Sequence, residues 1–210
     1  MQLVAMITML VDHIGKAFFP DQMEWRIVGR MAFPIYAYLL VLGYQRTSNL
    51  KRYLLRLTLI GILSQYPFMI ALDIKGINAV GTLLISLLAL IGLDTYKSYL
   101  QRGLILIASA ILLEFGQFDY GMYGLLLVCI YRYTKFHRMV ALHLLLNLVF
   151  VFLKGWLIES FSVIATICIA YAPNLFGWIG KLRIPRWLWL GFYPIHLTVL
   201  MLVEMLLLTK

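Results

Sequence analysis

The chain has 210 residues, of which 63% are hydrophobic and only 13% are charged. A soluble domain is about 45–50% apolar and 25% charged, so this composition excludes a soluble globular protein and predicts an integral membrane protein. The net charge is +9, but the basic residues gather in short connections between apolar runs, which is a topology signal of membrane proteins. We expect a single domain over residues 1–210, with no nucleic acid among its partners.

Apolar runs recur along the whole chain, and a spanning helix needs about 20 such residues. We predict an all-α, polytopic membrane bundle of about nine transmembrane helices (eight to ten), several of them shorter than a full crossing. The first run holds Asp12 and His13 where the apolar region of a cleavable signal would be uninterrupted, so we expect it to be the first span. The predicted helices cover residues 1–19, 27–46, 53–71, 79–94, 100–115, 120–134, 138–153, 157–173 and 187–208.

The basic residues lie in alternate connections, which predicts the orientation. Basic connections are usually cytoplasmic, so we expect the N-terminus inside and, after nine crossings, the C-terminus outside. The acidic residues fall mainly in the opposite set of connections. The basic set holds twelve of the eighteen Lys and Arg residues: Arg46, Lys51, Arg52, Arg56, Lys97, Arg102, Arg132, Lys135, Arg138, Lys181, Arg183 and Arg186.

Cys129 and Cys168 both fall in apolar runs. Free buried cysteines behave as small hydrophobic side chains, so we expect neither a disulfide nor thiol chemistry. No Cys/His spacing indicates a zinc site, and we expect no metal.

Ionisable residues mark the stretch from residue 8 to residue 34. An Asp or Arg at mid-span costs about 2.5–3.5 kcal/mol on insertion scales, so such residues need partners and usually mark a site. Asp12 and His13 are helix neighbours whose side chains point about 100° apart, which leaves Asp12 poorly placed to orient the His13 ring. Arg30 lies at a similar depth in the next predicted span. We predict an Asp12–Arg30 ion pair, with His13 free to act as a general base.

A purely structural interpretation of the same residues stays open. Asp12, Lys16 and Arg30 would then form a buried bridge that locks two helices, with His13 donating to a backbone carbonyl. His143 and Asn147 are four residues apart and share a helix face, where interhelical hydrogen bonding is the simpler explanation.

His196, in the sequence Phe-Tyr-Pro-Ile-His, is a second candidate for catalysis or substrate binding. A proline inside a helix frees the carbonyl four residues earlier, and two of the three predicted breaks lie beside ionisable residues: Pro34 with Arg30, and Pro194 with His196. Proline is common in membrane helices, so packing explains these breaks equally well.

The densest basic stretch runs from residue 46 to residue 56. It either anchors the inner face against anionic lipid or forms a cytoplasmic landing site for a phosphorylated cofactor or substrate. The second interpretation predicts four cofactor-binding residues: Arg46, Lys51, Arg52 and Arg56.

Several motifs resemble the TraX family of membrane acetyltransferases. They are AMITMLVDHIGKAFFP, RIVGRMAFPIYAYLLVLGYQRTSNLKRYLLRL, LSQYPFMIAL, DYGMYGLLL and FYPIHL. The family is named for acetylation of the N-terminus of a conjugative pilin subunit, and it is distantly similar to multispan acyl-CoA-dependent acyltransferases. The resemblance implies a multi-pass protein of the cytoplasmic (inner) membrane of a bacterium, with acetyl-CoA as donor substrate.

On that resemblance His13 is the family histidine, Asp12 and Arg30 are its polar partners, and His196 is the histidine of the closing motif. A base would remove a proton from an amine or hydroxyl acceptor, which attacks the thioester while a cation stabilises the oxyanion. No Ser or Cys is well placed for a covalent intermediate, so direct transfer is favoured. The acceptor is a peptide N-terminus, a glycan or a lipid headgroup.

The competing hypothesis is a non-enzyme, either a small proton-coupled transporter or a scaffold for an assembly apparatus. Buried ion pairs and broken helices suit a carrier, but the chain has no internal repeat. The expected partners are acyl-CoA, the acceptor and membrane lipids, and a homo-oligomer stays open.

Overall fold

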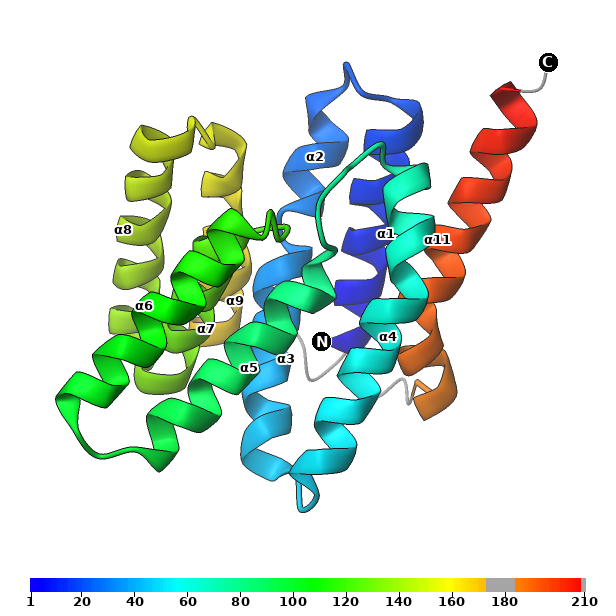
Figure 1. Cartoon of the computed structure of the whole chain (residues 1–210). Helices are drawn as coiled ribbons and strands as arrows, with labels where there is room; N and C mark the ends of the chain where they lie inside the picture. The colour runs from blue at the N-terminus through cyan, green and yellow to red at the C-terminus, as the bar shows by residue number, and fades with distance from the viewer. Residues whose placement is uncertain (173–183, 209–210) are drawn as a thin grey trace.

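The computed structural model describes residues 1–172 and 184–208 (Figure 1). All elements over these residues are helices, which confirms the predicted all-α class. They are α1 (Gln2–Phe18), α2 (Met23–Gly29), α3 (Ala32–Arg46), α4 (Leu50–Ala71), α5 (Ala79–Thr95), α6 (Tyr99–Phe115), α7 (Gly121–Tyr133), α8 (Phe136–Lys154), the 3-10 helix η1 (Leu157–Ser162), α9 (Val163–Tyr171) and α11 (Arg186–Leu208).

The predicted ranges match these helices closely, and the main correction concerns the second range. A single helix was expected over residues 27–46, but the chain is helical from Met23 and is interrupted at Arg30 and Met31, between α2 and α3. Pro34 has no N–H to bond the carbonyl of Arg30, so one helical hydrogen bond is missing at this junction. The interruption places Arg30 at a helix junction rather than within a straight span.

Helix length limits which elements can cross a membrane alone. In the described residues, four segments are long and apolar enough to do so: Met23–Arg46, Leu50–Ala71, Phe136–Lys154 and Arg186–Leu207. α1, α5 and α6 have 17 residues each, or about 25 Å at 1.5 Å per residue, which is short of the ~30 Å hydrocarbon core. Nine crossings, and the orientation of the N-terminus, therefore stay predictions.

The connections between helices gather at two ends of the molecule. Figure 1 shows the α3–α4 and α5–α6 connections at one end, and the α1–α2 and α8–η1 connections at the other. At the first end, these two connections and the helix ends beside them carry Arg46, Lys51, Arg52 and Lys97 of the predicted basic set. Lys181 and Arg183, which belong to the predicted basic set, lie outside the described residues.

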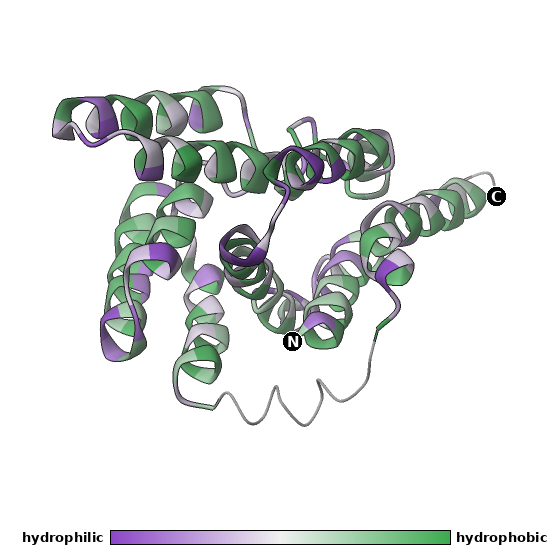
Figure 2. Cartoon of the chain, turned by 90° about the horizontal axis from the view of Figure 1, so that it is seen from below, coloured by the Kyte–Doolittle hydropathy of each residue, from purple (hydrophilic) through white to green (hydrophobic). Residues whose placement is uncertain are grey.

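The outer surface of the bundle is largely apolar. Hydrophobic residues predominate in most of the helices in Figure 2. α6 exposes a stripe at helical spacing, in which Leu100, Leu104, Ile107 and Ile111 are all more than half exposed. So large an exposed apolar surface suits a lipid environment.

α1 lies between the α2–α3 segment and α11. It packs against α2, α3 and α11, while α4 packs against α11 and α5. Large side chains such as Phe33, Leu87 and Tyr123 fill the main core, which is built mainly by α3, α5, α7, α8 and α9. Met9 of α1 belongs to a second core with Phe68 and Leu197. Packing against α2, α3 and α11 buries the polar residues Thr8, Asp12 and His13 of α1.

Candidate active site

A buried charge cluster joins α1, the α2–α3 junction and η1. Arg30 Nη2 donates to Asp12 Oδ1 at 2.7 Å, and Arg30 Nη1 donates to Glu159 Oε2 at 3.0 Å. Arg26 Nη1 lies 3.4 Å from the second oxygen of Asp12. The predicted Asp12–Arg30 ion pair is therefore present, and Arg30 is shared between two carboxylates.

Two glycines let α1 and α2 approach closely enough to form this pair. A Cβ on Gly29 would overlap the carboxylate of Asp12, and a Cβ on Gly15 would overlap Trp25. Gly29 is the glycine of the G-R-x-A-F-P sequence. Its missing side chain therefore makes the room in which Asp12 meets Arg30.

His13 and His196 form a second polar contact, between α1 and α11. His13 Nδ1 lies 2.8 Å from His196 Nε2, and the two rings are nearly parallel, at 13°. The other nitrogen of the second ring, His196 Nδ1, lies 2.6 Å from the carbonyl oxygen of Phe192. Both histidines are buried.

These hydrogen bonds assign the tautomers of both rings. A carbonyl oxygen only accepts, so His196 Nδ1 carries a proton and donates to Phe192. In the neutral ring His196 Nε2 then has a lone pair, and His13 Nδ1 donates to it. His13 Nε2 is left with a lone pair and no hydrogen-bond partner among the described residues.

The arrangement separates Asp12 from His13, as helix geometry predicts. Asp12 holds two arginines, whereas His13 Nδ1 contacts His196 rather than a backbone carbonyl. The structural interpretation correctly predicted the buried Asp12–Arg30 ion pair. Its prediction that His13 donates to a backbone carbonyl is wrong, because His13 Nδ1 contacts His196. The sequence predicted Asp12, His13, Arg30 and His196 as site residues, and the structure brings all four to one region.

Three neighbouring cavities surround this region. A cavity of about 60 Å³, the His13 cavity, is lined by Asp12, His13, Lys16 and Arg30. The tryptophan cavity, of about 530 Å³, shares Arg30 with it and also includes Trp156. The arginine cavity, of about 340 Å³, is mostly apolar. Its walls share four residues with the His13 cavity: Met9, Phe33, Ala79 and Tyr193.

Four residues of the site were missed by sequence reasoning. Arg26 lies four residues before Arg30, a spacing that places both on one helix face, and that signal could have found it. Glu159 lies 129 residues away from Arg30, and no local pattern links them. Asp119 and Tyr120, in the α6–α7 connection, line both polar cavities. Burial raises the pKa of the Asp119 carboxyl, against the opposing effect of Arg30 and Lys16.

A separate polar cluster surrounds His143 and ties α7, α8, η1 and α9 together. His143 Nε2 lies 2.8 Å from Tyr123 Oη, and His143 Nδ1 lies 2.6 Å from Thr166 Oγ1. The hydroxyl of Tyr123 also donates to Asn147 Oδ1 at 2.9 Å and lies 3.0 Å from Ser162 Oγ. His143 is fully buried. This is the interhelical hydrogen bonding that the sequence predicted for His143 and Asn147.

The four predicted cofactor-binding residues do not meet at one site in the structure. Arg46, Lys51 and Arg52 are exposed around the α3–α4 connection. Arg56, one turn further along α4, lines the arginine cavity together with Arg186. The structure thus brings only Arg56 of the four to a cavity.

Comparison with known proteins identifies relatives. The family model described as "TraX protein" matches residues 1–204. A probable fimbrial assembly protein FimC, serogroup H1, of Dichelobacter nodosus is 35% identical over 80 residues, which cover 35% of this chain and 32% of that protein. The chain therefore spans about a third of the curated relative that it matches. No solved structure matches the chain. The match over nearly the whole sequence shows that the chain belongs to the TraX family.

Proposed function

We propose that this protein is a membrane-embedded acetyltransferase of the bacterial cytoplasmic membrane, which transfers an acetyl group from acetyl-CoA to an amine or hydroxyl acceptor. The observation that carries the proposal is the lone pair on His13 Nε2, held by a chain of hydrogen bonds beside a cavity that also contains a charge cluster. A general base needs this combination of a fixed ring and a free nitrogen.

His13 would act as the base in direct transfer. Its Nε2 takes the proton from the acceptor, whose nitrogen or oxygen attacks the thioester carbonyl. The carbon–sulfur bond then breaks, and the thiolate of CoA takes the proton from His13. The products are the acetylated acceptor and free CoA, and no covalent enzyme intermediate forms.

His196 would be a positioning residue rather than a second base. Its Nδ1 proton is engaged by Phe192, and its Nε2 accepts from His13 Nδ1. When His13 takes up the acceptor's proton, the same hydrogen bond stabilises the imidazolium. An aspartate plays this part in the hydrolase triad. Here the neutral ring of His196 would stabilise the His13 imidazolium inside an apolar bundle.

The charged residues would divide into structural and electrostatic roles. Arg30 lies between Asp12 and Glu159, so its charge is largely neutralised and it would hold the site together. Lys16 and Arg26 also line the His13 cavity. Arg26 shares Asp12 with Arg30, whereas Lys16 has no ion pair among the described residues. Lys16 is therefore the better cation for an oxyanion, which needs a donor placed where charge develops.

Acetyl transfer by purified protein tests this proposal. The protein in neutral-lipid nanodiscs would be given radiolabelled acetyl-CoA and one of three acceptors: a peptide with a free N-terminus, an oligosaccharide or phosphatidylethanolamine. We expect label on one of them, and loss of transfer in His13→Ala. His137, which is exposed at the start of α8, supplies the matched control His137→Ala.

Two outcomes would contradict the proposal. One is the absence of labelled product with all three acceptors and with membrane extracts. The other is transfer at the same rate in His13→Ala and wild type. For the second outcome, His137→Ala must also transfer at the wild-type rate.

An assembly scaffold is the second candidate function, because the relative from Dichelobacter nodosus is named a fimbrial assembly protein. A scaffold would work through its surface and not through the His13 cavity. In that case deletion of the gene would impair surface-fibre assembly, and His13→Ala would restore assembly as well as the wild-type chain. The acetyltransferase proposal expects His13→Ala to fail.

A further inference from the structure

The arginine cavity lies between five helices and is lined mainly by apolar side chains. α1, α3, α4, α5 and α11 all contribute to its walls. Tyr36 and Trp189 stack on one another at 5.2 Å and form part of one wall. Its volume of about 340 Å³ falls within the usual range of small-ligand sites.

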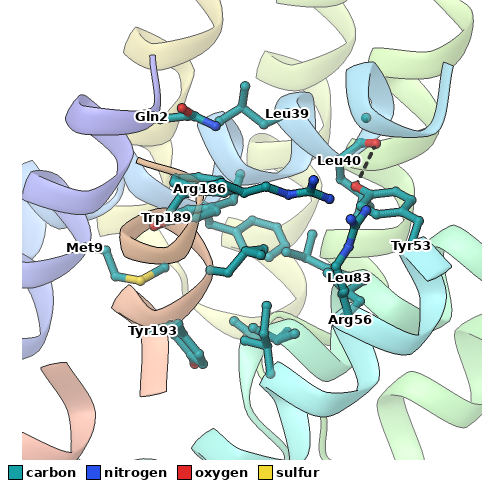
Figure 3. Close-up of a pocket in the computed structure, with 18 residues that line it drawn as sticks. Gln2, Met9, Leu39, Leu40, Tyr53, Arg56, Leu83, Arg186, Trp189 and Tyr193 are labelled. Carbon is teal, nitrogen blue, oxygen red and sulfur yellow. Dashed lines mark hydrogen bonds between the residues drawn. The ribbon is translucent and has the colours of Figure 1, made fainter. Parts of the chain in front are cut away.

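Two cations meet at one corner of this otherwise apolar cavity. Figure 3 shows Arg56 and Arg186 reaching toward the same corner, beside Tyr53. The Arg56 guanidinium lies 5.8 Å from the Tyr53 ring centroid. Neither arginine forms an ion pair with an acidic side chain in the part of the chain that the structure describes. Two unpaired guanidinium groups at one corner indicate an anion, and phosphate suits their planar donors best.

The opposite end of the arginine cavity meets the His13 cavity. Met9 and Tyr193 line both. Arg186 and His196 are ten residues apart on α11, which corresponds to about 15 Å along the helix axis. A ligand anchored at the arginines would therefore need a narrow arm of about this length to reach His13.

Phosphopantetheine, the arm of CoA, has this length and this chemistry. Roughly thirteen bonds separate its phosphorus from its sulfur, and they span about 15 Å because three bonds of an extended chain advance about 3.3–3.6 Å. Its dimethyl carbon and methylene groups suit apolar walls, and its phosphate suits the arginines.

We propose that the arginine cavity holds the phosphopantetheine arm of acetyl-CoA, with Arg56 and Arg186 on the phosphate and the thioester at the Met9–Tyr193 end. This proposal rests on the acetyltransferase function proposed above. It assigns donor binding to Arg186, an exposed residue at the start of the last helix, and removes it from Arg46, Lys51 and Arg52, which line none of the three cavities. Both arginines lie at the end of the bundle whose basic connections predict a cytoplasmic location, where CoA is available.

Binding of two small probes to the full chain in phosphatidylcholine nanodiscs tests the proposal. Phosphopantetheine and pantetheine differ only by the phosphate. We expect wild type to bind phosphopantetheine at least about tenfold more tightly, since a charge-assisted hydrogen bond contributes about 1.5–3 kcal/mol. Arg56→Gln and Arg186→Gln should each remove most of this preference and leave pantetheine affinity within about twofold of wild type. Arg138→Gln, at an exposed position on α8, is the matched control.

A second pair of variants tests the cavity itself. Ile60 lines the arginine cavity, whereas its neighbour Leu59 is 49% exposed on the outside of α4. Ile60→Trp should fill the cavity and lower CoA affinity by about tenfold or more, while Leu59→Trp should change it by less than about twofold. The thermal unfolding temperature of each variant shows whether it is folded.

The outcomes separate this proposal from the acetyltransferase function. CoA binding that depends on both arginines, without any acetyl transfer, would support the cavity assignment and contradict the function. Acetyl transfer with wild-type donor affinity in Arg56→Gln and Arg186→Gln would support the acetyltransferase function and contradict the cavity assignment. An equal loss of affinity in Arg52→Gln, or arginine-dependent binding of phosphatidylglycerol that CoA does not displace, would also overturn the assignment.

Discussion

His13 and His143 are both buried histidines on different helices of one bundle, but their ring nitrogens have different partners. His143 contacts hydroxyl groups through both nitrogens, Thr166 on one and Tyr123 on the other. His13 has a partner for Nδ1, and its Nε2 has none among the described residues. His13 lines a cavity, whereas none of the three cavities described above includes His143. The comparison shows that burial alone does not mark a reactive histidine; an unused nitrogen beside a cavity does.

Replacing each histidine by glutamine should give the largest difference between the two sites, in acetyl transfer for His13 and in stability for His143. His13→Gln should lower acetyl transfer by about 10²–10⁴-fold, the usual contribution of a general base. His143→Gln should instead lower the free energy of unfolding by about 1–3 kcal/mol, because it leaves buried hydroxyls without a partner. Transfer rates and thermal unfolding of both variants are the measurements. A similar loss of transfer per folded molecule in both would show that the two clusters do not differ in function.

The charge cluster beside His13 should respond strongly to the loss of Arg30. Arg30→Gln leaves the carboxylates of Asp12 and Glu159 buried without their shared cation, and such a loss costs about 3–5 kcal/mol of stability. Thermal unfolding in detergent measures the effect. The triple variant with Asp12→Asn and Glu159→Gln should recover part of it. An Arg30→Gln protein as stable as wild type would contradict the proposed structural role of Arg30.

The hydrogen bond between His13 and His196 should affect rate more than binding. We expect His196→Ala to lower kcat by about 10–100-fold, the value of a buried hydrogen bond worth about 1.5–3 kcal/mol, with little change in KM. His196→Gln should recover part of kcat, because its amide oxygen can accept from His13 Nδ1. The pH profile of kcat provides a further test, since the loss of a positioning residue shifts the apparent pKa of the base. An unchanged profile with a raised KM would instead place His196 in substrate binding.

The smallest effect on stability and activity is expected at Tyr123, in the polar cluster around His143. Tyr123→Phe removes one hydroxyl, but His143, Asn147 and Ser162 keep their mutual hydrogen bonds. The stability should fall by about 1 kcal/mol, and the rate of acetyl transfer by folded protein should not change. A loss of activity without a loss of stability would connect this cluster to the reaction.

The sequence was sufficient to predict elements whose signals are local. Hydropathy located the helices, and the similar depth of Asp12 and Arg30 in successive runs predicted their ion pair. The interruption at Arg30 and Met31 was missed although Pro34 indicated a freed carbonyl, because proline disturbs helices to different degrees. The helices continue through Pro67 in α4 and Pro194 in α11.

Contacts between distant segments could not be predicted in the same way. His13 and His196 are 183 residues apart, and their hydrogen bond depends on how α1 packs against α11. The basic stretch was recognised by composition, but only position along α4 decides that Arg56 reaches a cavity while Arg52 stays exposed. Local chemistry selected candidate residues, and tertiary packing decided their partners.

The two carboxylates that hold Arg30 become available at different times during synthesis. Asp12 precedes Arg30 by 18 residues, whereas Glu159 follows it by 129 residues. The chain emerges from its N-terminus, and an unpaired charge enters a bilayer at a cost. A hairpin of α1 and the α2–α3 segment already contains the Asp12–Arg30 ion pair. Glu159 and His196 join only when the last third of the chain has been made. The Asp12–Arg30 ion pair can therefore form well before the candidate site, which also needs Glu159 and His196, is complete.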